Sequence, residues 1–158
     1  MKTLPESRPS GSGAAAAAAA VNPLLQPWTA PHGLPPFAEI RAEHFEPALR
    51  EGMRAHREEL AAITGQTAAP DFDNTVAAFD RSGQLLDRVG AAFATLTASA
   101  TNDALQAVQR AMAAPLAAHR NAVYLDEALF ARIEAVHARR AALALAPEAV
   151  RLLERVHL

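Results

Sequence analysis

The chain has 158 residues and a formal net charge of −2 at pH 7, with 15 basic and 17 acidic residues interspersed along it. This balance disfavours nucleic acid and anionic membranes as partners, because neither would meet a broad positive field. The absence of cysteine excludes disulfides and thiolate chemistry and agrees with a cytoplasmic location. Half of the hydrophobic residues are alanine, which favours helix but contributes little area to a core.

Residues 1–21 are predicted to be a disordered tail or linker. Residues 1–13 are rich in Pro, Ser and Gly, and residues 14–20 are all alanine. A secretory signal is an alternative, but its apolar core would be weakly hydrophobic, and Glu6 and two prolines interrupt the approach to it. We therefore prefer the linker interpretation.

Residues 22–37 form a Pro-rich segment with five prolines among its sixteen residues. Proline at this density excludes a regular helix and predicts an extended course over the surface of other elements. Leu24, Leu25, Trp28 and Phe37 are its candidate apolar contacts. Recognition by an aromatic-lined groove is an alternative, but the interleaved large apolar residues favour a contact within the chain.

The first predicted helix covers residues 45–63, where apolar residues recur at helical spacing and Pro47 falls in the first turn. His56 lies in the middle of its apolar face. The usual state of such a histidine is a neutral imidazole that is hydrogen-bonded to a neighbouring helix. We predict this state for His56 rather than a metal-binding role.

Residues 69–97 are predicted to contain one long amphipathic helix, because Phe79, Leu86 and Phe93 fall on one line of the helical wheel. An Asp-Asn-Thr run at residues 73–75 supplies side-chain oxygens for its first turn. Two glycines, Gly83 and Gly90, lie one heptad apart and are expected to let another helix approach closely.

Three more helices are predicted after residue 100. Thr101 or Asn102 would cap the third helix, and Pro115 is expected to kink or divide it. The fourth would begin after an N-cap at Asp126, with Leu125 and Phe130 spaced as a hydrophobic staple, and the fifth would begin at Pro147. The predicted fold is therefore all-α, with about five amphipathic helices after the Pro-rich segment and no membrane span.

Two Glu-x-x-His pairs are the strongest candidates for metal ligation. Glu134 with His137, and Glu154 with His157, could ligate a di-iron or di-manganese centre if both pairs faced the interior of a bundle. The helical wheel instead places Glu134 beyond the edge of its apolar face and Glu154 well outside the next one. The sequence also lacks a His-Glu-x-x-His motif, a phosphate-binding Gly-rich loop and a nucleophile elbow. We therefore assign no catalytic, cofactor-binding or metal residue.

Four segments carry a family resemblance. They are NPLLQPW at 22–28, LPPFAEIRAEHFEPALREGM at 34–53, PDFDNTVAAFDRSGQLLDRV at 70–89 and TNDALQAVQRAMAAPLAAHRNAVYLDEALFARI at 101–133. In this order and spacing they resemble the amino-terminal region of the thimet oligopeptidase and oligopeptidase A family of zinc metallopeptidases, and within it the bacterial peptidyl-dipeptidases. The resemblance covers residues 22–158.

The resemblance implies a helical part of a larger peptidase. Family members cleave short peptides in a deep channel between two largely helical halves, and peptidyl-dipeptidases release dipeptides from the carboxyl end. The resemblance implies that residues 22–158 form part of a channel wall or lid and that zinc is held elsewhere, by His-Glu-x-x-His and a downstream Glu. Because the helical pattern runs to Leu158 without a stop signal, we expect a truncation before the catalytic domain.

The expected partners are the remainder of the peptidase and, in the intact enzyme, short peptides. The chain by itself is predicted to be inactive and to self-associate through exposed apolar faces. The alternative is a freestanding helical interaction module that binds a peptide or a partner helix.

Overall fold

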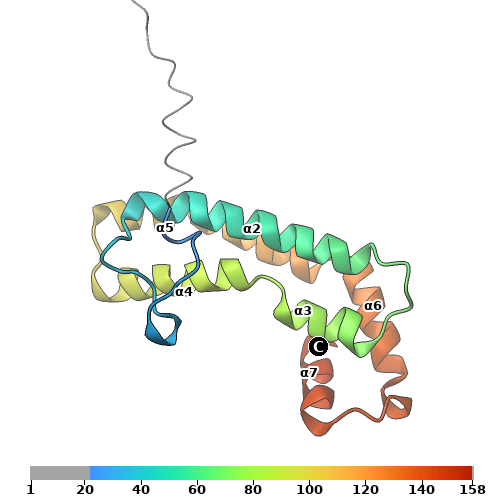
Figure 1. The fold of residues 1–158 in the computed structure, drawn as a ribbon. Helices are drawn as coiled ribbons and strands as arrows, with labels where there is room; N and C mark the ends of the chain where they lie inside the picture. Colours follow the sequence, from blue (N-terminus) through green and yellow to red (C-terminus); the bar gives the residue numbers. More distant parts are fainter. Residues whose placement is uncertain (1–21, 158) are drawn as a thin grey trace, which may run out of the picture.

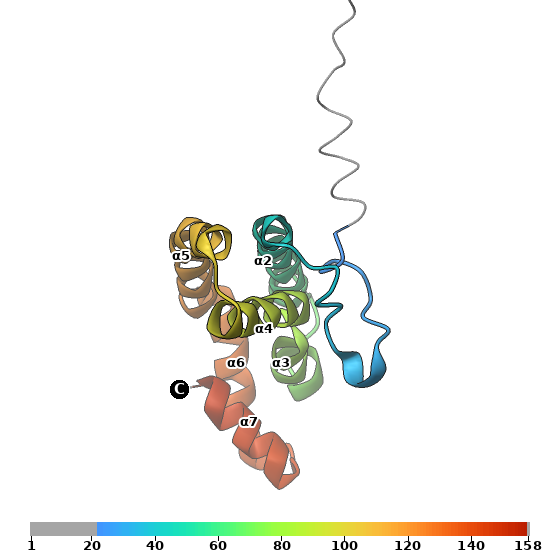
Figure 2. The same cartoon turned by 90° about the vertical axis from the view of Figure 1, so that its left-hand side faces the viewer.

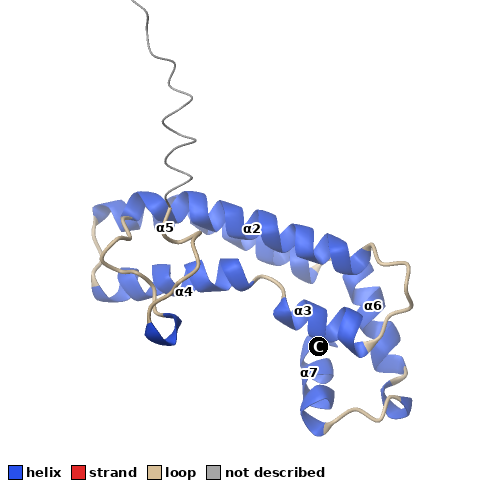
Figure 3. Cartoon of the chain, in the orientation of Figure 1, coloured by secondary structure: helices blue, strands red, loops and turns tan. Residues whose placement is uncertain are grey.

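The computed structural model describes residues 22–157, and these contain helices and loops but no strand (Figure 3). The all-α prediction is confirmed. The predicted tail at residues 1–21 lies outside the described part. The elements in chain order are η1 (Pro31–Gly33), α2 (Ala42–Thr64), η2 (Phe72–Ala77), α3 (Ala78–Arg81), α4 (Gln84–Ser99), α5 (Asp103–Tyr124), α6 (Glu127–Ala138), η3 (Arg140–Ala142) and α7 (Pro147–His157). None of these helices is long and apolar enough to cross a membrane.

The helices form an elbow. Helix α2 packs along both α4 and α5, and these three helices make the long arm in Figures 1 and 2. Helices α6 and α7 pair with each other, contact η2, and turn away from the long arm to make the short one (Figure 1). Five of the helices have eleven residues or more, as the hydrophobic periodicity predicts.

Each arm of the elbow has its own hydrophobic core. The long-arm core comprises Leu24, Phe45, Ala48, Leu49, Met53, Val89, Ala92, Leu105 and Met112. The short-arm core comprises Leu60, Ile63, Val76, Leu129, Ile133, Val136 and Leu153. Helix α2 contributes to both cores, because its apolar face runs the whole length of its 23 residues.

The Pro-rich segment packs against the long arm, as predicted. Leu24 is fully buried, and Leu25 and Trp28 pack against the long-arm core. Asn22, which is also buried, donates from Nδ2 to the His44 carbonyl (2.8 Å) and accepts at Oδ1 from the Leu24 amide (3.0 Å). The prediction fails at Phe37, which is 40% exposed and does not pack against this core.

The helix predicted within residues 69–97 is not continuous. It is divided into η2, α3 and α4, with a break at Ser82 and Gly83. Gly83 has φ of +75°, a left-handed conformation that glycine adopts without steric cost, and its amide donates to Glu59 Oε2 of α2 (2.6 Å). The apolar face continues across the break, so periodicity alone gave no sign of it. The cap also lies earlier than predicted, since Asp71 Oδ1 accepts from the Asn74 amide (2.7 Å).

Two helices approach each other closely at Gly52, which the sequence did not single out. A Cβ at this position would lie 2.9 Å from the Leu86 Cα and 3.1 Å from the Leu86 Cβ, so α2 and α4 are in contact through backbone atoms. The expectation for Gly90 is wrong, because a Cβ there would meet nothing within 4 Å. Gly83 does sit against another helix, with the His56 ring 3.1 Å from its Cβ position.

The prolines have less effect on the helices than predicted. Helix α5 runs as one element through Pro115, so this residue does not divide it. Helix α2 begins at Ala42, which places Pro47 beyond the first turn. The predicted start of α7 at Pro147 is confirmed.

The two predicted N-caps of the later helices are confirmed. The side chains of Asn102 and Asp126 accept from the amides of Leu105 and Leu129, respectively, both at 2.9 Å. The expected hydrophobic staple beside Asp126 is wrong, because both of its members, Leu125 and Phe130, are exposed.

Candidate functional site

A polar layer separates the two cores. On α2, His56 lies between Met53 of the long-arm core and Leu60 of the short-arm core. Its Nδ1 is 3.1 Å from Nε2 of His119 on α5, and its Nε2 is 3.2 Å from the hydroxyl of Ser82, at the break between α3 and α4. The predicted hydrogen bond between His56 and a neighbouring helix is therefore confirmed.

The hydrogen bonds of the polar layer fix which nitrogens carry protons when both rings are neutral. The Ser82 hydroxyl donates to the Phe79 carbonyl (2.7 Å), so His56 Nε2 must donate to Ser82. His56 Nδ1 then accepts from His119 Nε2, which leaves His119 Nδ1 as a buried acceptor without a partner. Adding a proton to this pair would bury a donor that has no acceptor.

Burial lowers the pKa of both histidines in this layer. For His56, desolvation outweighs the attraction of Glu59 and Asp87. For His119, which is 7% exposed, desolvation is reinforced by repulsion from His56 and Arg57. The neutral forms that the hydrogen bonds require are therefore also the forms that the electrostatics favour at neutral pH.

A pocket of about 760 Å³ opens at the inside of the elbow, next to this layer. Its walls come from α2, the α3–α4 break, α5, α6 and α7, and both polar and apolar side chains line it. Phe130 and Tyr124 also line it and are 52% and 79% exposed, and Leu125 beside Tyr124 is 78% exposed. These three large side chains, which are exposed around the turn from α5 to α6, make up what we call the exposed apolar corner.

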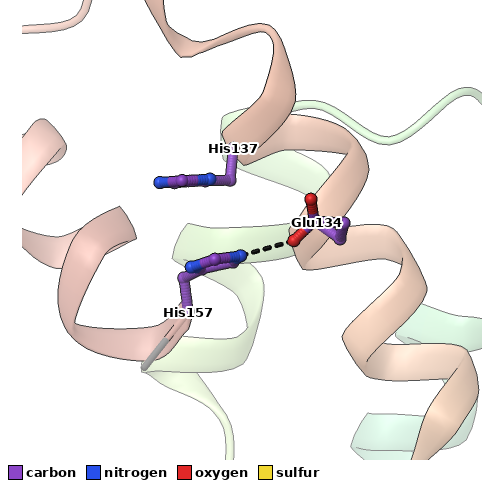
Figure 4. A group of neighbouring side chains, drawn as sticks. All are labelled: Glu134, His137 and His157. Atoms are coloured by element: carbon purple, nitrogen blue, oxygen red, sulfur yellow. Dashed lines mark hydrogen bonds and ion pairs between the residues drawn. The ribbon is translucent and has the colours of Figure 1, made fainter.

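A second group of polar side chains lies where α6 meets α7. Glu134, His137 and His157 each present a potential ligand atom, and these atoms lie within 4.8 Å of one another (Figure 4). His157 Nε2 is bonded to Glu134 Oε2, and the two imidazole rings are stacked, with centroids 3.8 Å apart and planes 11° apart. Glu134 lies on the exposed side of α6, as the helical wheel predicts, but its carboxylate meets His157 of α7 there. Glu154, the fourth candidate, is not part of this group.

The helical wheel did not indicate this contact, because it compares a side chain only with the apolar face of its own helix. Leu153 of α7 packs in one core with the apolar face of α6, and this pairing brings His157, the last residue of α7, to Glu134. The i, i+3 spacing of Glu134 and His137 already placed both on one side of α6. The position of His157 depends on the turn through η3, for which the sequence carries no clear signal.

Arg132 is a buried residue that sequence analysis missed. It is 9% exposed, and its guanidinium donates to the carbonyls of Gln66 (3.2 Å) and Ala68 (3.4 Å) and to Asn74 Oδ1 (3.1 Å). These bonds hold the loop between α2 and η2 against α6. The sequence did contain an indication of this burial, because Arg132 is a charged residue next to Ile133 in the apolar face of α6.

The zinc motif of the peptidases that the sequence resembles has no counterpart in this chain. The 158-residue sequence contains no His-Glu-x-x-His motif, and the Glu134, His137 and His157 group has a different spacing and comes from two helices. The residues present do not fit the zinc motif of the peptidases that the sequence resembles. No step of hydrolysis is therefore assigned to them.

The similarity of the chain to known proteins gives its class. No model of a known protein family matches the chain. The chain is 46% identical over 136 residues to a dipeptidyl carboxypeptidase of Salmonella typhimurium and 44% identical over 137 residues to one of Escherichia coli strain K12. These matches cover 86% and 87% of the chain but only 20% of each relative.

The relatives confirm the resemblance drawn from the four segments. The chain is similar over most of its length to part of two dipeptidyl carboxypeptidases, which belong to the thimet oligopeptidase and peptidyl-dipeptidase family. It spans about one fifth of the length of the curated relatives it matches.

Proposed function

We propose that residues 22–158 form a non-catalytic helical part, a channel wall or lid, of a zinc-dependent peptidyl-dipeptidase that releases C-terminal dipeptides from short peptides. The observation that carries this proposal is the 44–46% identity to two dipeptidyl carboxypeptidases over most of the chain. In this proposal, zinc and the residues that activate water belong to the remainder of the peptidase, and the intact enzyme is cytoplasmic.

The structure supports such a role through its exposed apolar corner. Tyr124, Leu125 and Phe130 are large side chains that an isolated helical domain would normally bury in part. In the proposed enzyme they contact the remainder of the peptidase. Without that partner they would be available for self-association.

A chimera provides the test. The fifth of the Escherichia coli dipeptidyl carboxypeptidase that matches this chain would be replaced by residues 22–158, and dipeptide release from a short blocked peptide would be measured. A second chimera would carry the same residues with Tyr124→Asp, Leu125→Asp and Phe130→Asp. The isolated chain with added zinc is the third sample.

We expect the first chimera to be active, the second to lose activity or to fail to assemble, and the isolated chain to be inactive. A first chimera that folds but has no activity would refute a shared structural role. Zinc-dependent, chelator-sensitive hydrolysis by the isolated chain would refute the non-catalytic assignment. Both results are read from the same peptide assay.

A further inference from the structure

The group formed by Glu134, His137 and His157 has a donor set and a placement that suit a metal ion. Glu134 and His137 are one helical turn apart on α6, and His157 lies in the last turn of α7, so the three ligand atoms come from two elements that already pack together (Figure 4). Two imidazoles and one carboxylate are ligands that zinc accepts. Their ligand atoms lie within 4.8 Å of one another.

We propose that Glu134, His137 and His157 bind one zinc ion that links α6 to α7, with the fourth position open to water. This ion is distinct from the zinc of the proposed peptidase, whose motif this chain lacks. The proposal does not depend on peptidase activity.

Binding requires a small rearrangement that the side chains can make. The lone pairs of two stacked, nearly parallel rings do not converge on one point, so one ring must rotate about its Cβ–Cγ bond. This torsion of histidine is soft, with a broad energy minimum. The Glu134 oxygen that is hydrogen-bonded to His157 Nε2 already lies beside that ring. On binding, the zinc ion would replace the proton between these two atoms.

The surroundings of the site leave room for a cation. Glu134 is half exposed and His157 is 25% exposed by side chain, so a hydrated ion can reach both. Glu134 and Glu154 both place negative charge near His137, whereas Arg140 opposes them from the end of α6. Arg140 also donates to the His137 carbonyl (3.0 Å).

The test is direct zinc binding by the full 158-residue chain. After treatment with a chelator and dialysis, calorimetric titration with zinc chloride gives the stoichiometry and affinity, and cobalt(II) substitution gives an absorption spectrum that reports coordination. His137→Phe removes a ligand nitrogen while keeping a ring in the stack, and His157→Ala removes the α7 ligand. His32→Ala, an exposed histidine in η1, is the matched control.

We expect one equivalent of zinc to bind, a tetrahedral cobalt(II) spectrum, and a zinc-dependent rise in melting temperature. His137→Phe and His157→Ala should each weaken binding by at least about tenfold, and His32→Ala should leave it unchanged. Circular dichroism of each variant separates loss of binding from loss of fold. The proposal is overturned if the wild-type chain takes up no zinc, or if a folded His137→Phe chain binds it as tightly as the wild type.

Discussion

Replacement of Gly52 by alanine tests whether α2 and α4 are packed as closely as the structure shows. A methyl group at this position would lie 2.9 Å from the backbone Cα of Leu86, closer than two such carbons can approach. One helix must therefore move. Gly90→Ala on α4 is the matched control, because its new methyl group would meet nothing within 4 Å.

Both substitutions increase helix propensity, but only Gly52→Ala introduces a steric overlap with another helix. Alanine is favoured over glycine in a helix interior by about 1 kcal/mol, and this gain applies to both. Overpacking of a close contact costs about 1 to 3 kcal/mol and applies only to Gly52→Ala. We therefore expect Gly90→Ala to raise the free energy of unfolding by about 1 kcal/mol, and Gly52→Ala to leave it unchanged or lower it by up to about 2 kcal/mol.

Urea denaturation followed by circular dichroism at 222 nm measures both changes by linear extrapolation. The quantity to compare is the difference between the two variants, because the shared helix propensity cancels in it. If both substitutions stabilise the chain equally, α2 and α4 are not in backbone contact at Gly52, and the arrangement of the long arm described here is wrong.

Three more predictions concern buried polar groups. Arg132→Met should lower the free energy of unfolding by about 2 kcal/mol in urea denaturation, because it removes three hydrogen bonds from a charged donor. Asn22→Ala should cost about 1 to 3 kcal/mol in the same assay, because it leaves the buried Leu24 amide without its acceptor. Because the folded pKa values of His56 and His119 are lowered, the unfolded chain binds more protons, so stability should fall as pH drops below about 6.5 and level off below the folded pKa values.

Each of these predictions has its own control. Arg132→Lys keeps the charge but cannot reach three acceptors at once, so it should also destabilise the chain. If the lysine variant were as stable as the wild type, the three hydrogen bonds of the guanidinium would not be what stabilises this loop. Asn22→Asp keeps the acceptor for Leu24 and should cost less than Asn22→Ala. For the pH dependence, His119→Gln should reduce the fall in stability between pH 7 and 5, and an unchanged profile would assign that fall to other groups.

The sequence predicted the helices well because their signals are local. An asparagine or aspartate before an apolar run is sufficient to mark a helix start, and the caps at Asn102 and Asp126 were found in this way. His56 was placed correctly for a similar reason, since a polar ring on an apolar face needs a partner on a neighbouring helix. The partner itself, His119, lies 63 residues away in the sequence.

Three of the features that the sequence did not predict depend on how helices meet one another. At the break at Gly83 the chain passes from one core to the other, because Phe79 of α3 packs against the short-arm core whereas Val89 and Ala92 of α4 are buried in the long-arm core. The role of Gly52 could not be read from α2, since it depends on the path of α4. The meeting of Glu134 with His157 likewise follows from the packing of α7 against α6.

The polar layer at His56, His119 and Ser82 has a consequence for how this region opens. It interrupts the apolar packing halfway along α2, so that each arm keeps a hydrophobic core of its own. We therefore expect the short arm to open locally while the long arm stays folded. Amide hydrogen exchange would then show two groups of residues with different protection factors. The boundary between the groups would lie near His56, within helix α2, rather than at a loop.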